Sequence, residues 1–309
     1  MSRLPMSGLP MSRLPMSRLA NARLRCAVVA AVAAALPAGC GGGGPTTVSI
    51  PKVAPAQTFS LGAFAPTGRI VARRPTMMSF DIRTPSGRPL THYKTGPGPH
   101  TGVHLIIVRN DLADIIHDHP PIAANGMLRQ QVTFPAPGPY HVLVDAYPDV
   151  AGEPPNFQLT RTVGVAGAYR PAKLPPFHAD EVIDGYHFHM HAPASGPAIH
   201  AIQAQFVHLD VTGPDGRPVH FTPWFGALAH AIFFRQGSLD YFHTHVCAPD
   251  APNCGSLPGV AASRVSGRAT APGKITLGVL LPVSGTWRLF VQLKQHGRII
   301  TARFTLHVH

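Results

Sequence analysis

Histidines are the residues of this sequence whose number and spacing indicate chemistry. There are 19 in 309 residues, and all of them lie at or after His92. Neutral imidazole is the commonest metal ligand among protein side chains, and it titrates near physiological pH. Three groups are distinguished by their spacing: His104, His117 and His119; His230, His243 and His245; and His187, His189 and His191.

The first two groups have identical spacing, because the second and third histidines follow the first by 13 and 15 residues in both. Their surroundings match as well. Asp81-Ile-Arg-Thr-Pro-Ser-Gly-Arg-Pro-Leu90 aligns with Asp210-Val-Thr-Gly-Pro-Asp-Gly-Arg-Pro-Val219, and a Pro-x-x-Gly-x-aromatic segment ends at Tyr140 in one copy and at Trp287 in the other. The chain therefore contains an internal repeat.

Each copy of the repeat predicts a metal site. Residues two apart on a strand point to the same face, about 7 Å apart, so His117 and His119 can approach one ion, as can His243 and His245. A third imidazole would come from the start of the preceding strand, at His104 or His230. Three imidazoles with an open position suit Cu²⁺ or Zn²⁺. We expect twin sites, with copper ahead of zinc.

A structural interpretation of the same histidines stays open. An imidazole can donate one ring N–H to a backbone carbonyl and so fasten a loop, and such a contact would also persist through a duplication. The protein would then be a non-enzymatic interaction module that presents loops to an envelope protein partner. The geometry separates the two interpretations, since ligand rings converge whereas fastening rings each face a carbonyl.

The third histidine group has no equivalent in the first copy. Alternation places His187, His189 and His191 on one face of a strand, with Phe188 and Met190 on the other. This face predicts an outer metal-loading site, in which Met190 could assist Cu⁺. The alternative is an edge strand whose polar face consists of histidine.

Short strands must position these side chains. Gly and Pro supply 30 and 34 residues, and turn-forming segments separate short apolar or alternating runs. We expect the strands of the first copy at 58–64, 76–83, 103–109, 115–119, 129–134, 140–146 and 157–165. This predicts an all-β fold of two tandem immunoglobulin-like or cupredoxin-like β-sandwich domains, at 58–168 and 183–309, joined by a linker at 169–182.

The N-terminal region predicts export. Arginines precede a short apolar run, and Leu36-Pro-Ala-Gly-Cys40 resembles a bacterial lipobox. We expect a signal peptide with a repetitive extension at 1–40, lipidation of Cys40 and a Gly/Pro-rich tether at 41–57. Pro37 departs from the lipobox pattern, which leaves ordinary cleavage near Ala38 as the alternative. In an oxidising compartment Cys247 and Cys254 predict a disulfide, with paired thiolate ligands as the alternative.

Composition and motifs exclude several functions. The formal net charge is +12, but basic residues are scattered and form no stripe with interleaved aromatics, so nucleic acid is not expected as a partner. No nucleophile elbow, His-Glu-x-x-His or phosphate-binding loop occurs. We expect no enzymatic activity; a metal-dependent enzyme would need an acid or base beside the metal. Membrane association is expected through the lipid anchor only.

Two segments carry a family resemblance. Phe221-Thr-Pro-Trp-Phe-Gly-Ala-Leu-Ala-His230 and Tyr241-Phe-His-Thr-His245 resemble a group of uncharacterised bacterial exported proteins with tandem β-sandwiches, over roughly residues 60–309. The resemblance implies a secreted sandwich fold with metal-binding potential. Val246 departs from the proline that usually follows the motif, whereas Pro120 keeps it. Our hypothesis is an envelope carrier, buffer or sensor of copper or zinc, with neutral histidine ligands.

Overall fold

The computed structural model describes residues 58–153, 155–248 and 265–309, and its regular elements are strands. The N-terminal half contains eight: β1 Ser60–Ala65, β2 Ile70–Val71, β3 Pro75–Arg83, β4 Val103–Arg109, β5 Ile115–Asp118, β6 Leu128–Thr133, β7 Gly138–Ala146 and β8 Phe157–Ala166. The predicted strands of the first copy are confirmed, with boundaries that differ by a few residues at most.

The C-terminal half contains nine further strands among the described residues. They are β9 Asp180–Ile183, β10 Tyr186–Met190, β11 Gln205–Thr212, β12 Ala229–Arg235, β13 Tyr241–Cys247, β14 Gly267–Ala271, β15 Lys274–Val279, β16 Gly285–Gln295 and β17 Arg298–Val308. The all-β prediction is therefore confirmed, and the repeat is visible as the correspondence of β3, β4, β5 and β7 with β11, β12, β13 and β16.

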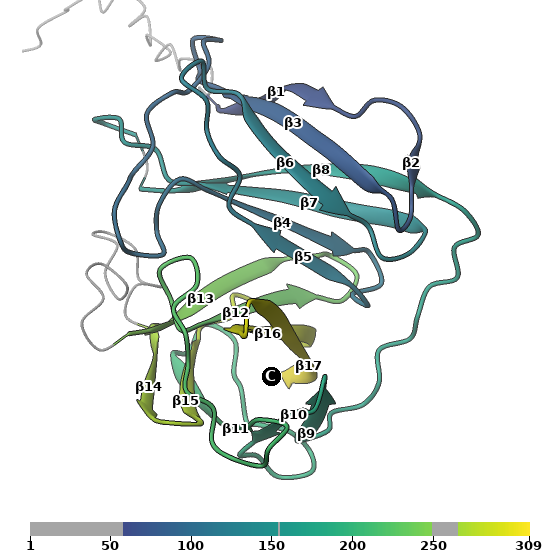
Figure 1. The fold of residues 1–309 in the computed structure, drawn as a ribbon, viewed down its shortest axis with the longest axis vertical. Coiled ribbons are helices and arrows are strands. Elements are labelled where there is room, and N and C mark those ends of the chain that lie inside the picture. The colour runs from purple at the N-terminus through teal and green to yellow at the C-terminus, as the bar shows by residue number, and fades with distance from the viewer. Residues whose placement is uncertain (1–57, 154, 249–264) are drawn as a thin grey trace, which may run out of the picture. The chain divides into compact units, whose positions relative to one another are not determined.

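Each half has its own hydrophobic core (Figure 1). In the N-terminal half the sheet β1-β3-β6 and the sheet β2-β8-β7-β4-β5 enclose one core. In the C-terminal half the strands join in the order β17-β16-β12-β13-β14-β15-β11-β10-β9, where β13 and β14 form a parallel pair. Side chains from both ends of this order pack into the second core.

Equivalent aromatic anchors fix the start of β7 and β16. The Tyr140 hydroxyl donates to the Ala136 carbonyl at 2.9 Å, and the Trp287 Nε1–H donates to the Val283 carbonyl at 3.1 Å. Both rings are fully buried. The preceding glycines, Gly138 and Gly285, have φ of 131° and 128°, which other residues adopt only with strain. The repeated Gly-x-aromatic pattern thus sets the same turn in both halves.

The two halves pack against each other through one face of each. Ile106 and Val108 of β4 meet Ile232 and Phe234 of β12 in a third apolar cluster, which Leu143 and Phe290 complete. This packing explains why β4 and β12 are buried on both faces, since Leu105 and Ala231 point into the separate cores. All the described residues lie within one compact unit.

The first histidine of each triad lies on the face that joins the halves. Side chains alternate along a strand, so His104 shares its face with Ile106, and His230 shares its face with Ile232. Figure 1 shows β4 and β5 beside β12 and β13, in agreement with the ring contacts between their histidines. The contact between halves therefore continues from apolar side chains into imidazoles.

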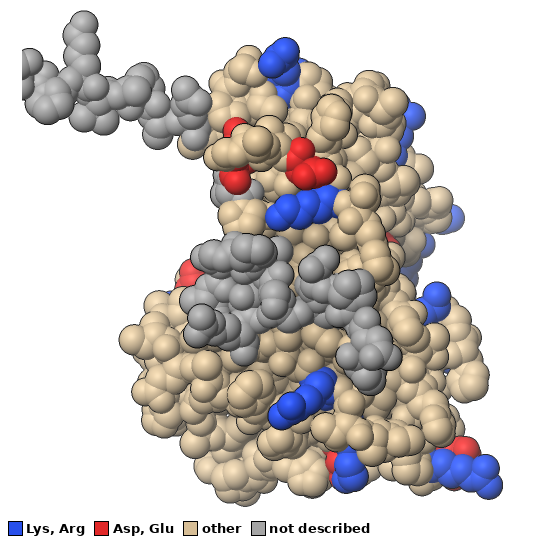
Figure 2. Space-filling model, turned by 90° about the vertical axis from the view of Figure 1, so that its left-hand side faces the viewer, with Lys and Arg blue, Asp and Glu red and all other residues tan. Residues whose placement is uncertain are grey.

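Charged side chains are sparse on the face in Figure 2, and acidic and basic groups are scattered rather than gathered by sign. In the described parts of the chain, no helix has the length and apolar character needed to cross a membrane. The predicted signal peptide, Cys40 and the 41–57 tether lie outside the described residues, as does Cys254, the predicted partner of Cys247.

Candidate metal centre

The structure places the six histidines of the two repeated triads in one cluster. Rings from opposite halves lie close together: the centroids of His117 and His230 are 4.8 Å apart, and those of His104 and His243 are 5.3 Å apart. We expected one separate site in each copy; the two triads instead lie together, while His104, His117 and His119 of the first expected site form one of the close ligand sets. The triads share one location because the strands that carry them face one another.

Two hairpins with the same register position these side chains. In β4–β5 Ile106 lies opposite His117, and in β12–β13 Ile232 lies opposite His243. In each hairpin the first histidine lies two residues before the isoleucine on the same strand face, next to the third histidine of its triad. The rings of His104 and His119 stack at 4.0 Å, and those of His230 and His245 lie 5.0 Å apart.

Burial keeps the cluster uncharged. His104 and His230 are fully buried, and burial lowers the pKa of His104 to about 3 and that of His230 to about 4. Burial and neighbouring imidazoles also hold the pKa of His117, His243 and His245 well below the usual value. Neutral imidazole is the form that binds a metal ion.

In three of the rings, one of the two ring nitrogens makes a hydrogen bond that fixes the orientation of the ring. His104 Nε2–H donates to the Pro99 carbonyl at 2.7 Å, and His230 Nε2–H donates to the Trp224 carbonyl at 2.9 Å. A carbonyl only accepts, so each of these rings carries its proton on Nε2 and has a free electron pair on Nδ1. Bonds of this kind orient metal-ligating histidines.

Gln292 fixes the third ring from the opposite half. Its Nε2 donates to Thr301 Oγ1 at 3.1 Å, which turns its Oε1 toward His117 Nδ1 at 3.2 Å. His117 Nδ1–H therefore donates to this oxygen, and His117 Nε2 has the free electron pair. The sequence analysis did not select Gln292, because its partner lies 175 residues away in the chain.

The remaining nitrogens include an unusual number of buried atoms without a hydrogen-bond partner. Five belong to the cluster: His104 Nδ1, His117 Nε2, His119 Nε2, His243 Nδ1 and His245 Nε2. A buried polar atom left unpaired costs roughly 1–3 kcal/mol. Five at one place are therefore a strong departure from the rule that buried polar groups are paired.

One contact links two histidines directly. His230 Nδ1 and His243 Nε2 lie 3.2 Å apart. Because His230 has its proton on Nε2, His243 Nε2–H is the donor in this pair. His243 Nδ1 then has a free electron pair, as do His104 Nδ1 and His117 Nε2.

Three overlapping sets of histidines bring their ligand atoms within 4.8 Å of one another: His104 with His243 and His245, His104 with His117 and His119, and His117 with His230 and His243. Two of these sets take ligands from both halves. Nitrogens bound to one ion at 2.0–2.1 Å in tetrahedral geometry lie about 3.3 Å apart, so binding requires small inward ring movements. The all-nitrogen donor set suits copper or zinc.

Loops from both halves cover the cluster. The Phe225 ring stacks on His119 at 3.8 Å, and Trp224 lies edge-on to His117 at 5.3 Å. A Cβ at Gly226 would come within 2.5 Å of the Gly98 carbonyl carbon in the facing loop. Glycine is favoured at this position for a second reason, since Gly226 has φ of 75°, which residues with a Cβ adopt only with strain.

A buried carboxyl group lies on the same interface. Asp145 is the register partner of His104, and Asn156 donates to it at 3.2 Å. The hydroxyls of Tyr147 and Tyr241 donate to its other oxygen, both at 3.4 Å. Burial raises the pKa of Asp145 to about 6. Asp145 belongs to none of the three candidate ligand sets found among the described residues.

The third histidine group lies elsewhere: His187 and His189 are on β10, and His191 directly follows its last residue, Met190. Phe188 and Met190 are buried, and the alternation predicted for this strand is confirmed. His187 Nε2 and His189 Nδ1 both contact Asp180 Oδ1 at 2.8 Å, and His191 Nε2 lies 3.2 Å from Asp210 Oδ2. In the described chain these histidines do not form one of the close ligand sets, so the outer loading site stays a prediction.

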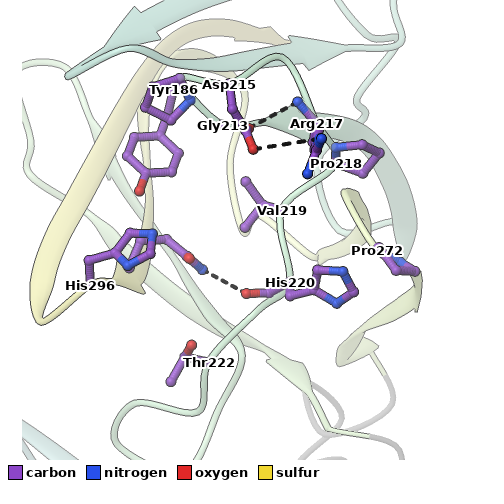
Figure 3. Close-up of a pocket in the computed structure, with 12 residues that line it drawn as sticks. Tyr186, Gly213, Asp215, Arg217, Pro218, Val219, His220, Thr222, Pro272 and His296 are labelled. Atoms are coloured by element: carbon purple, nitrogen blue, oxygen red, sulfur yellow. Dashed lines mark hydrogen bonds and ion pairs between the residues drawn. The ribbon is translucent and has the colours of Figure 1, made fainter.

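The repeated Pro-x-Gly-Arg-Pro turn forms a hollow in each half. The hollow in the C-terminal half has a volume of about 830 Å³, and Figure 3 shows Asp215 facing Arg217 in it. Gln295 Nε2 donates to the His220 backbone carbonyl at 3.0 Å. An equivalent hollow of about 610 Å³ includes Arg88 in its lining. Neither hollow is lined by a histidine of the cluster. The Pro-x-Gly-Arg-Pro motif occurs in both halves because it forms the same turn in each.

One family model matches the C-terminal part of the chain. Residues 180–309 match a family model described as "Domain of unknown function (DUF8832)". This supports the resemblance to an uncharacterised β-sandwich family. None of the curated proteins matches the chain.

The solved structures that the comparison found have low sequence identity to this chain. A tetra-tandem repeat from the extending region of a large adhesion protein is 9% identical, with 81% of this chain and 49% of that chain covered and a TM-score of 0.25. Fibronectin(III)-like modules of Clostridium thermocellum CbhA are 11% identical, with 81% and 93% covered and a TM-score of 0.20. Domains 4 and 5 of the S-layer protein SbsC are 11% identical, with 81% and 97% covered and a TM-score of 0.20. This chain thus spans about half of the first of these chains, and we take the fold from its own strands.

Proposed function

We propose that this protein binds a transition metal ion, copper ahead of zinc, between its two halves, as a carrier, buffer or sensor in the cell envelope. The observation that supports the proposal is the convergence of buried, neutral imidazole nitrogens that lack a partner. A divalent ion would pair these nitrogens, and the hydrogen bonds on the opposite ring nitrogens would hold the rings in place.

His104, His243 and His245 form the most favourable ligand set. Their available atoms are His104 Nδ1, His243 Nδ1 and His245 Nε2, all of which are buried and unpaired. Coordination through these atoms leaves the bonds of His104 to Pro99 and of His243 to His230 intact. The set takes one ligand from β4 and two from β13, so a bound ion would fasten the halves together.

A second candidate function rests on two of the same contacts. His104 and His230 each donate to a backbone carbonyl of the preceding loop, as fastening histidines would. In that case the protein is a non-enzymatic module that presents its loops to an envelope partner. This role accounts for the Nε2 atoms of His104 and His230. It does not explain why five other imidazole nitrogens of the cluster are buried without a hydrogen-bond partner.

Export belongs to the proposal and is supported by the N-terminal sequence pattern. We propose a signal peptide, a lipid anchor at Cys40 and a Cys247–Cys254 disulfide, with no enzymatic activity. A reducing-agent mobility shift tests the disulfide, and metabolic labelling with a fatty acid tests the anchor.

Metal binding is tested by titrating the purified full chain with Cu²⁺ and Zn²⁺ against a chromogenic chelator. The test variant replaces His104, His243 and His245 with Gln, and the matched control replaces His187, His189 and His191 with Gln. We expect tight binding by the wild type and the control, and a loss of at least 100-fold in the test variant with its circular dichroism unchanged. No binding by the wild type, or equal binding by the test variant, would overturn the proposal.

A further inference from the structure

We infer that the cluster has a second metal site, formed by His117, His230 and His243, and that the His243 ring bridges the two ions. This inference rests on the proposed function, because the first ion is the one held by His104, His243 and His245. The three ligand atoms of the second set also lie within 4.8 Å of one another.

Two ligands of the second site are already oriented. His117 Nδ1–H donates to Gln292, which leaves its Nε2 buried and unpaired. His230 Nε2–H donates to the Trp224 carbonyl, which leaves its Nδ1 with a free electron pair. Each ring therefore presents one lone pair and has its other nitrogen engaged, as in established metal sites. Neither of these rings belongs to the ligand set of the first ion.

His243 is the ring that the two sites share. Its Nε2 lies 3.2 Å from His230 Nδ1, and its Nδ1 is buried without a partner. The separation of 3.2 Å is close to the roughly 3.3 Å between two nitrogens on one tetrahedral ion. An ion placed there would displace the Nε2 proton to solvent, and both nitrogens of the resulting imidazolate would then be ligands.

Bridging also leaves fewer unpaired groups than separate binding. If His243 bound only the second ion, through Nε2, its proton would move to Nδ1, which is a buried atom with no acceptor. An unpaired buried donor is costly. When the ring bridges, neither nitrogen is left unpaired. The two ions would lie roughly 6 Å apart across the ring, given metal–nitrogen bonds of about 2.0 Å.

Charge favours the same arrangement. The three close ligand sets of the described chain contain histidine alone, so two divalent ions would bring a charge of +4 into a buried site lined by neutral rings. Concentrated charge is unfavourable away from water. The negative charge of a bridging imidazolate lies between the ions and reduces their mutual repulsion. His119 Nε2 is also buried and unpaired, and it supplies one further candidate ligand atom for a metal ion beside His104 and His117.

The test measures copper content and the electron paramagnetic resonance of the full chain loaded with Cu²⁺. We expect two ions per chain, with a signal well below the total copper content because the bridge couples the two spins. His117→Gln and His230→Gln should each reduce the content to one ion and restore a full uncoupled signal. His141→Gln, on β7 outside the cluster, is the control and should keep two coupled ions.

The outcomes separate this inference from the proposed function. One ion in the wild type, unchanged in His117→Gln, would refute the second site and leave the first in place. Two ions with a full uncoupled signal would refute the bridge. No bound copper would refute the proposed function as well. His117→Gln removes no contact to the backbone, so it keeps the test valid if His230→Gln fails to fold.

Discussion

Acidification below pH 6.5 should destabilise the metal-free protein through its buried histidines. Burial lowers the pKa of His104 to about 3 and that of His230 to about 4, whereas both titrate near 6.5 in the unfolded chain. Between these values the unfolded state binds protons that the folded state excludes. Stability is therefore complete above pH 6.5 and falls as the pH drops below it.

The size of the effect follows from these two shifts. A histidine that stays neutral in the fold at pH 5 and protonates in the unfolded chain removes about 2 kcal/mol, or about 4 kcal/mol for His104 and His230 together. Burial lowers the pKa of the other four cluster histidines as well, so their effect has the same sign. A typical domain has about 5–15 kcal/mol of stability in total.

Denaturant unfolding at pH 7.5, 6.5, 5.5 and 5.0 measures this loss. Trp224, whose ring contacts His230 of the cluster, and Trp287 in the C-terminal core report on both regions by fluorescence. The His104→Gln variant should show a shallower pH dependence, by about one proton. Stability that stays constant or increases from pH 7.5 to 5.0 would refute the assignment of neutral buried histidines.

Four further predictions concern the interface and its loops. Phe234→Ala removes a fully buried ring between the halves and should lower the unfolding free energy by about 3–5 kcal/mol, measured by denaturant titration; a change below 1 kcal/mol would mean that the halves do not pack there. Gly226→Ala should lower the melting temperature, because its methyl group collides with the Gly98 carbonyl carbon, whereas Gly216→Ala meets no neighbour and serves as the matched positive-φ control. Gln292→Leu leaves His117 Nδ1–H without an acceptor and should weaken binding of the second ion, whose ligands include His117, about 10- to 100-fold by chelator competition; unchanged affinity for that ion would exclude His117 as a ligand. A metal concentration 100-fold above the dissociation constant should raise the unfolding free energy by about 2.7 kcal/mol in the wild type and not in the His104/His243/His245 variant.

The strands were predictable from sequence because local rules determine them. Gly138 and Gly285 set turns, alternation along β10 separates Phe188 from His189, and apolar runs mark β4 and β12. What covers the outer face of β4 was not predictable. Leu-Ile-Ile-Val is apolar on both faces, and nothing local says that Ile232 and Phe234 of the other copy occupy one of them.

The sequence predicted which six histidines belong to the candidate site, but it did not predict that they lie together between the two halves. Spacing alone selected the six histidines, since a strand period of two places His117 with His119 and His243 with His245. Their convergence depends on the packing of the halves, which is a long-range property. Gln292, Trp224 and Phe225 were not selected as site residues, because each acts through contacts with the N-terminal half.

The matched register of the two hairpins bears on how the chain arose. Faces that present the same residues in the same order can associate by two-fold symmetry, so a single-unit ancestor with this face could have formed a homodimer. In such a dimer equivalent positions must be identical. Asp145 and Gln292 occupy equivalent positions on β7 and β16, yet one is held by tyrosines and the other orients His117. Fusion into one chain is what allows the two sides of the interface to specialise.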